Sequence, residues 1–226
     1  MKTRRDFLKT FLAGSGAMLL APALRGQTAF GSISPALFNA YAADDAWAQL
    51  PLILKRIKPP VFPKREFDIT RYGAVADGKT DCAAAFRQAI AACNKAGGGK
   101  VVVPAGTFLT GAIHLKSNVN LHVAEGATIK FSQDTAQYLP LVFTRFEGME
   151  LMNYSPFIYA FEQQNIAVTG KGTLDGNSDD GHWWPWKGQA QHGWKKGEPN
   201  QLKARKTLEE MTERGAPVNE RIFGEG

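Results

Sequence analysis

Apolar and polar residues alternate along much of the chain after Gly99. The alternation is clearest in four short stretches: residues 112–116, 119–123, 129–131 and 166–169. A period of two is typical of half-buried β-strands, and turn-forming pairs such as Ser117-Asn118 and Glu125-Gly126 separate the stretches. Strand centres near positions 102, 114, 121 and 129 lie too close together for helical crossovers, which need about a dozen residues. The pattern therefore predicts either an antiparallel meander or a coiled β-solenoid.

A helix is predicted just before these strands. Residues 80–97 are rich in alanine, with Thr80 or Asp81 as the expected N-cap and Gly97 as the expected end. One face of this helix carries only small or apolar side chains: Cys82, Phe86, Ala89, Ile90 and Cys93. We expect this face to pack against the core.

Cys82 and Cys93 are the two cysteines of the sequence. Eleven residues of helix would separate their Cα atoms by about 16 Å, whereas a disulfide requires at most about 7 Å. Two cysteines without nearby histidines also make a poor metal site. We expect two buried thiols that behave as small apolar side chains.

The formal net charge of +6 is concentrated at the N-terminus. Residues 1–42 carry five Lys or Arg against one Asp, a net +4, whereas residues 43–226 carry 22 basic and 20 acidic residues, a net +2. The larger part of the chain has no long run of one sign, so nucleic acid is not an expected partner. With 226 residues, 44% of them hydrophobic, and 23 glycines and 12 prolines without a fixed period, the composition indicates a globular protein of many short elements.

The N-terminal charge is explained by a targeting signal. Residues 3–9, which include the pair Arg4-Arg5, resemble a twin-arginine export signal, and the apolar stretch 11–20 follows. Ten apolar residues are too few to span a bilayer, which takes roughly 20, so no stable membrane anchor is expected. The resemblance implies transport by the twin-arginine translocase to the periplasm or beyond, with cleavage after Ala23 or Ala42.

Several motifs in a fixed order resemble one enzyme family. Residues 67–81, the helix and residues 97–108 resemble the opening of the pectate-lyase-like β-helix superfamily. Residues 109–121, 125–129 and 165–176, with the pair Trp183-Trp184, resemble the N-terminal coils of bacterial polygalacturonases of glycoside hydrolase family 28. The resemblance covers about residues 66–186.

The resemblance implies an all-β fold, a right-handed parallel β-helix with an N-terminal capping α-helix. It also implies hydrolysis of α-galacturonosidic or related pectic linkages by inversion, with no metal or other cofactor. Inversion uses a carboxylic acid and a carboxylate base roughly 6.5–9.5 Å apart. A pectic polysaccharide or oligosaccharide is the expected partner.

The sequence departs from the family in its catalytic motifs. Neither the Asn-Thr-Asp nor the Gly-His-Gly motif occurs in the 226 residues. Arg56-Ile57-Lys58 matches another family motif in spelling, but it precedes the β-helix, so we interpret it as a coincidence. Asp179-Asp180 imitates the catalytic aspartate pair, but it lies in a polar loop where a solvated turn is the favoured interpretation. The expectation is that the catalytic residues lie on coils missing from this chain.

The resulting organisation has four parts. They are a signal peptide with a flexible segment (1–42), a linker (43–65), the N-terminal coils of the β-helix (66–186), and a polar insertion with a helix over 201–214 ended by Gly215 (187–226). Because no closing strand or cap follows, we expect an incomplete solenoid and a truncated chain, inactive by itself.

Candidate ligand-binding residues lie at the end of the matched region. His182, Trp183 and Trp184 are the expected substrate-binding residues, since an indole can stack on a sugar ring; packing of the tryptophans against the outside of the β-helix is the alternative. His114 and His122 should face outward as exposed strand residues, and no metal ligand is expected. Two other classes stay open: a non-catalytic carbohydrate-binding or structural β-helix, and a cofactor enzyme, for which the sequence carries no ligand cluster or nucleotide fingerprint.

Overall fold

The computed structural model describes residues 46–224, so residues 3–9, which we predict to be an export signal, lie outside the described part of the chain. The chain divides into two units at the boundary between Lys58 and Pro59, inside the segment interpreted as a linker. The described part of the first unit is a short helical segment, η1 (Ala46–Gln49) followed by α3 (Leu50–Arg56). The pattern analysis did not predict this segment. Among the described residues, no helix is long and apolar enough to cross a membrane.

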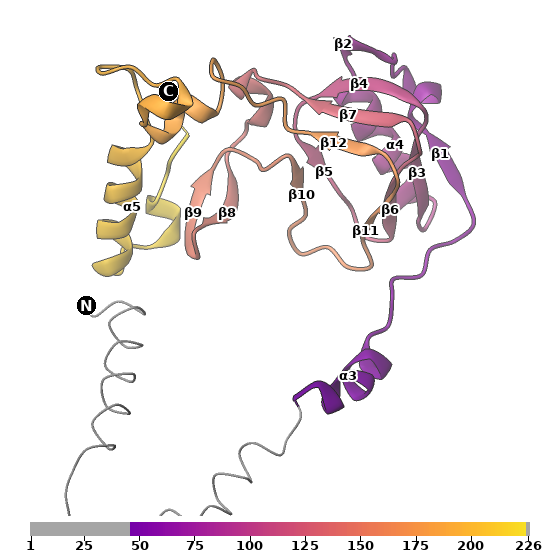
Figure 1. Cartoon of the computed structure of the whole chain (residues 1–226). Coiled ribbons are helices and arrows are strands. Elements are labelled where there is room, and N and C mark those ends of the chain that lie inside the picture. Colours follow the sequence, from indigo (N-terminus) through magenta and orange to yellow (C-terminus); the bar gives the residue numbers. More distant parts are fainter. Residues whose placement is uncertain (1–45, 225–226) are drawn as a thin grey trace, which may run out of the picture. The chain divides into compact units, whose positions relative to one another are not determined.

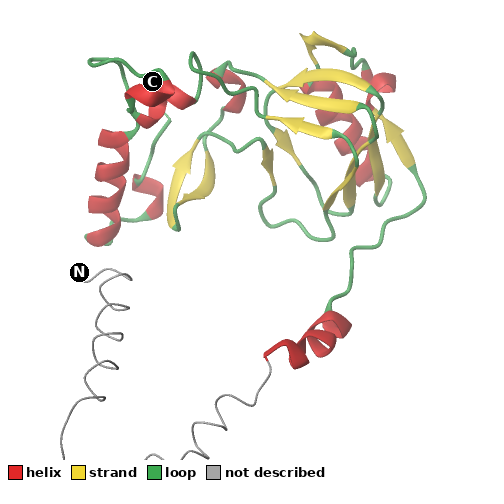
Figure 2. Ribbon diagram, in the orientation of Figure 1, coloured by secondary structure: helices red, strands yellow, loops and turns green. Residues whose placement is uncertain are grey.

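The second unit contains three parallel sheets (Figures 1 and 2). Their hydrogen-bonded orders are β1-β3-β6-β11, β2-β4-β7-β12 and β5-β10. The strands are β1 (Glu66–Asp68), β2 (Asp77–Asp81), β3 (Gly99–Val103), β4 (Gly106–Thr110), β5 (Ile113–His114), β6 (Val119–Val123), β7 (Ala127–Phe131), β10 (Ile158–Tyr159), β11 (Ala167–Gly170) and β12 (Thr173–Asp175). Consecutive strands belong to different sheets, and each pairs with the strand one coil away. This pairing is that of a parallel β-helix, which confirms the expected fold class and excludes the meander.

Short 3-10 helices connect or follow the strands. They are η2 (Ile69–Tyr72), η3 (Thr135–Tyr138), η4 (Trp184–Lys187), η5 (Ala190–His192) and η6 (Val218–Glu220).

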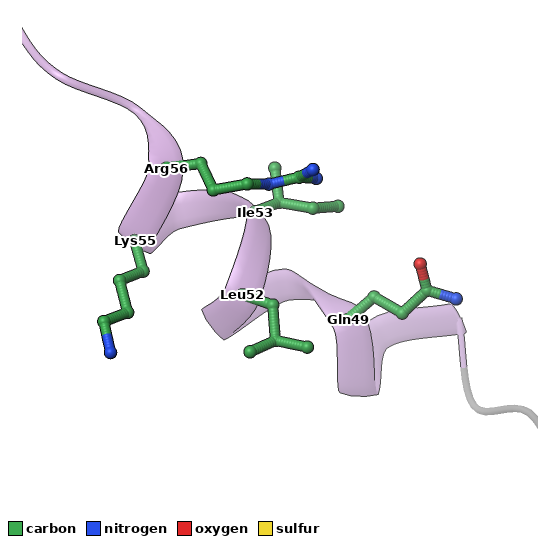
Figure 3. A pocket seen from close by; sticks show the side chains of 5 residues that line it. All are labelled: Gln49, Leu52, Ile53, Lys55 and Arg56. Atoms are coloured by element: carbon green, nitrogen blue, oxygen red, sulfur yellow. The ribbon is translucent and has the colours of Figure 1, made fainter.

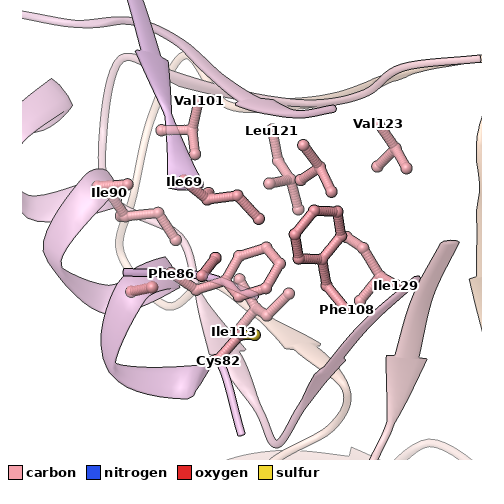
Figure 4. Packing of buried hydrophobic residues seen from close by; sticks show 14 of the residues in the cluster. Ile69, Cys82, Phe86, Ile90, Val101, Phe108, Ile113, Leu121, Val123 and Ile129 are labelled. Carbon is pink, nitrogen blue, oxygen red and sulfur yellow. The ribbon is translucent and has the colours of Figure 1, made fainter. Parts of the chain in front are cut away.

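Columns of apolar side chains fill the β-helix interior. Val101, Leu121 and Val168 are in register on neighbouring strands of one sheet. Phe108, Ile129 and Leu174 form a matching column in the second sheet. The members from the first two coils are fully buried, and Figure 4 shows four of them, Val101, Phe108, Leu121 and Ile129, packed together. On the third coil, Val168 and Leu174 keep 44% and 46% of their surface exposed, so both columns end there.

Helix α4 (Ala83–Lys95) packs against β1 and β3 as the N-terminal cap. It begins later than predicted: Thr80 and Asp81 belong to β2, which pairs with β4. The Asp81 side chain nevertheless caps the helix, because its Oδ1 accepts a hydrogen bond from the Ala83 N–H at 2.9 Å. The expected end is confirmed, since Gly97 has a φ of 85° and the Gly98 N–H donates to the Cys93 carbonyl at 2.9 Å.

The expected burial of the two cysteines is confirmed. Cys82 and Cys93 are free, buried residues on the core-facing side of α4. Desolvation raises the pKa of the Cys93 thiol to about 11 and also raises the pKa of Cys82. Both side chains are therefore uncharged at neutral pH.

An insertion interrupts the second coil between β7 and β10. It contains an antiparallel hairpin, β8 (Val142–Phe146) and β9 (Met149–Asn153), which the alternation did not predict. The second helix, α5 (Leu202–Glu213), confirms the expected helix and packs against β9, with Leu208 buried. The chain then returns to β9, where the Met152 N–H donates to the Arg221 carbonyl at 2.9 Å. Residues after 200 thus cover the hairpin instead of continuing the solenoid.

Candidate functional site

A tryptophan-rich loop leaves the β-helix after β12 and carries the residues predicted to bind substrate. We call residues 176–194 the tryptophan loop; it contains four of the five tryptophans of the chain: Trp183, Trp184, Trp186 and Trp194. The two 3-10 helices η4 and η5 lie within it and contact each other.

The loop begins with a tight hairpin from Asp179 to His182. The Asp179 and His182 backbones exchange two hydrogen bonds, each 3.1 Å long. The Asp179 Oδ1 accepts from the Gly181 N–H at 2.8 Å and from the His182 Nδ1 at 2.9 Å, and its Oδ2 accepts from the Gln133 amide at 3.0 Å. These donors, with the His182 ring first, hold the pKa of Asp179 below its usual range.

Trp183 follows the hairpin in an unusual backbone conformation, with φ 67° and ψ −54°. The Trp184 N–H donates to the His182 carbonyl at 2.8 Å, so residues 182–184 form a three-residue γ-turn with a positive central φ. Such a conformation costs on the order of 1–3 kcal/mol for a residue with a side chain. The surrounding structure must therefore hold the turn in place.

The Trp183 side chain is anchored on the chain's own aromatic residues. Its ring meets Phe157 edge-on, with centroids 5.6 Å apart, and meets Tyr138 at the same separation. Phe157 in turn stacks on the buried Phe131 of β7 at 4.4 Å. A continuous series of ring contacts therefore runs from the β-helix interior to Trp183.

Trp186 carries this series to the surface, and Trp184, two residues before it in the sequence, is also exposed. Trp186 lies 4.6 Å from Trp183 between ring centroids, and it retains 38% of its surface; Trp184 retains 49%. The Trp186 carbonyl accepts a hydrogen bond from the Gln201 N–H at 2.8 Å, which ties η4 to the start of α5. Two indole rings are thus exposed to solvent, in a turn held by the Trp183 ring and by the hydrogen bond from Gln201.

The segment that carries these rings is basic, and acidic residues lie at both of its ends: Asp179 and Asp180 before it and Glu198 after it. Residues 181–196 contain Lys187, Lys195 and Lys196 and no Asp or Glu, and all three lysines are exposed. The η5 turn lies close to the hairpin, because a Cβ added to Gly193 would come within 2.5 Å of the Asp180 carbonyl oxygen. A segment that exposes both indole rings and lysines suits a ligand that has apolar ring faces and carboxylates.

The predicted site residues have different surroundings. His182 and Trp184 are exposed, as a ligand-binding role requires, whereas Trp183 is half-buried and supports Trp186. Trp186 was not among the predicted binding residues. Its position two residues after Trp184, in a short turn, could have indicated that it is also exposed. Asp180 is exposed, and Asp179 is occupied by hydrogen bonds within the loop.

The remaining candidates lie elsewhere. His114 is exposed, with its Nε2 2.9 Å from the Ser155 Oγ, as expected of an outward strand residue. His122 is half-buried, contrary to expectation, because Thr169 of the next coil contacts its Nδ1 at 3.0 Å. No group of three His, Cys, Asp or Glu residues that would hold a metal occurs within residues 46–224.

Arg56-Ile57-Lys58 lies at the end of α3, before β1, so it is not on a coil of the β-helix. Arg56 borders the hollow shown in Figure 3, whose lining residues all come from η1 and α3: Gln49, Leu52, Ile53, Lys55 and Arg56. Because a single helical segment forms the whole lining, the hollow encloses no ligand site.

Fold and loop together define a parallel β-helix protein of the pectate-lyase-like class. The family model described as "Rhamnogalacturonase A/epimerase, pectate lyase-like" matches residues 67–192, more than half of the chain. The chain belongs to this family.

Individual relatives are polygalacturonases. Over 118 residues the chain is 36% identical to an exo-poly-alpha-D-galacturonosidase of Dickeya chrysanthemi, covering 49% of this chain and 19% of that protein. It is 31% identical over 119 residues to an exopolygalacturonase of Zea mays, covering 50% of this chain and 25% of that protein. The crystal structure of a hyperthermoactive exopolygalacturonase from Thermotoga maritima has 54% sequence identity and a TM-score of 0.75, over 78% of this chain and 39% of that one. The chain thus spans well under half the length of these relatives.

Proposed function

We propose that the chain belongs to a pectin-degrading glycoside hydrolase that cleaves α-galacturonosidic linkages, and that the described residues contribute a substrate-binding surface. The family match and the polygalacturonase relatives support the substrate class. The observation that carries the assignment to this chain is the pair of exposed indoles, Trp184 and Trp186, in a segment (residues 181–196) that contains three exposed lysines and no acidic residue.

The chemistry of galacturonan matches this surface. A pyranose ring has apolar C–H faces that stack on an indole, and every residue of polygalacturonate carries a carboxylate. The exposed lysines attract those carboxylates, a gain in affinity that neutral glycans of the same stacking ability do not receive. Binding then weakens as salt screens the charges.

The catalytic step requires two separated carboxyl groups, one to protonate the leaving oxygen and one to activate water. The tryptophan loop offers two adjacent aspartates, Asp179 and Asp180, and both oxygens of Asp179 accept hydrogen bonds from the loop and from Gln133. The sequence contains no Asn-Thr-Asp or Gly-His-Gly motif. We therefore assign binding, and not bond cleavage, to these 226 residues.

Reducing-end release from polygalacturonate tests whether the chain binds the polymer without cleaving it. The 226-residue chain should bind the polymer and release no reducing ends above a buffer control. An active polygalacturonase serves as the positive control in the same buffer. Turnover by this chain would contradict the proposal and would make Asp179, Asp180 and His182 candidates for a catalytic group.

A further inference from the structure

The γ-turn at Trp183 is an unfavourable conformation on which the exposed indoles depend. Trp184 is the third residue of the turn and Trp186 packs on the Trp183 ring, so both rings move if the turn relaxes. The Trp183 Nε1 adds a second cost, because it is buried and meets no acceptor among the residues that the structure describes. The turn therefore requires contacts that offset both costs.

Besides the ring contacts of Trp183, Asp179 ties the turn to the β-helix. Its Oδ1 fixes the hairpin through the Gly181 N–H and the His182 ring, at 2.8 and 2.9 Å. Its Oδ2 accepts from Gln133, two residues after β7, and the same Gln133 amide donates to the Asn177 carbonyl at 2.8 Å. One carboxylate thus joins the last residues before the turn to the second coil.

We propose that Asp179 is a positioning residue for ligand binding: through Gln133 and the hairpin it holds the γ-turn that presents Trp184 and Trp186 to solvent. The inference rests on the proposed function of these two indoles. It gives the aspartate a role other than acid–base chemistry, since its carboxylate accepts three hydrogen bonds within the protein.

Three variants separate positioning from a general effect on folding. Asp179→Ala removes all three hydrogen bonds, and Asp179→Asn keeps an oxygen that accepts from the Gly181 N–H. Asp180→Ala is the matched control one position away, where the structure gives the side chain no hydrogen bond. The probe is trigalacturonate, titrated calorimetrically into the full chain, with near-ultraviolet circular dichroism of the tryptophans as a second measurement.

Asp179→Ala should weaken binding about tenfold or more, and should reduce the near-ultraviolet signal because the Trp183–Trp186 contact becomes disordered. Asp179→Asn should recover part of both losses, and Asp180→Ala should match the unmodified chain. If Asp179→Ala fails to fold, Gln133→Leu, which removes the contact to Oδ2, should show the same two losses in milder form.

The outcomes distinguish the two proposals. If the unmodified chain does not bind trigalacturonate, the proposed function is wrong, and the circular dichroism of the variants still tests whether Asp179 orders the loop. If the unmodified chain binds and Asp179→Ala matches Asp180→Ala in affinity and spectrum, the positioning role is wrong.

Discussion

Replacing Phe108 with alanine should lower the free energy of unfolding by about 3–5 kcal/mol. Phe108 lies in the middle of β4, has no exposed surface, and is in register with Ile129 of the next coil. Removal of its ring leaves a cavity next to Ile129, whose position is fixed by the parallel pairing of β4 with β7, so the site relaxes poorly. Denaturant unfolding followed by far-ultraviolet circular dichroism measures the loss.

Lys130→Ala on the neighbouring strand is the matched control for this prediction. Lys130 alternates with the buried Ile129 and Phe131 and is only partly buried. Its replacement should change stability by no more than about 0.5 kcal/mol. Equal effects of the two substitutions would show that Phe108 does not lie in the packed interior.

Replacing both Trp184 and Trp186 with alanine should weaken the binding of trigalacturonate about a hundredfold or more. Truncation of an exposed tryptophan that becomes buried by a ligand commonly costs about 2 kcal/mol or more, and each tenfold loss of affinity corresponds to about 1.4 kcal/mol. Neither ring belongs to the buried core, so the thermal unfolding temperature should change little. Isothermal titration of the unmodified and variant chains gives the comparison.

Trp47→Ala provides the control for loss of an exposed indole. Trp47 keeps 76% of its surface exposed and belongs to the other unit. Its replacement should leave the affinity for trigalacturonate unchanged. A similar loss in both variants would place the binding surface outside the tryptophan loop.

The alternation predicted those strands of the β-helix in which apolar side chains on one face are buried and the residues between them are more polar. The alternation in residues 119–123 matches β6 at both ends, since Val119, Leu121 and Val123 face the interior. The hairpin β8–β9 escaped prediction because most of its residues are partly buried on both faces, which removes the two-residue period. Periodicity also left the partner of each strand undetermined, since side-chain burial is the same in a meander and in a solenoid; the family resemblance supplied the parallel pairing.

The site was only partly predictable, because its contacts join distant segments. The tryptophan pair drew attention to the loop, but Trp183 contacts Tyr138 and Phe157, which lie 45 and 26 positions earlier in the sequence. Nothing in the local sequence therefore distinguishes the anchoring ring from the exposed one. Asp179 likewise differs from Asp180 in its hydrogen bond with Gln133, a residue 46 positions earlier in the sequence.

Hydrogen–deuterium exchange of the 226-residue chain, recorded with and without trigalacturonate, locates the binding surface. We expect the ligand to slow exchange within residues 181–196, where Trp184, Trp186 and the three lysines lie, and to leave the strands of the first two coils unchanged. Maltotriose, a neutral trisaccharide, should produce no such protection. Unchanged exchange in residues 181–196, or protection confined to another surface such as the edge formed by β11 and β12, would contradict a galacturonan-binding role for the tryptophan loop.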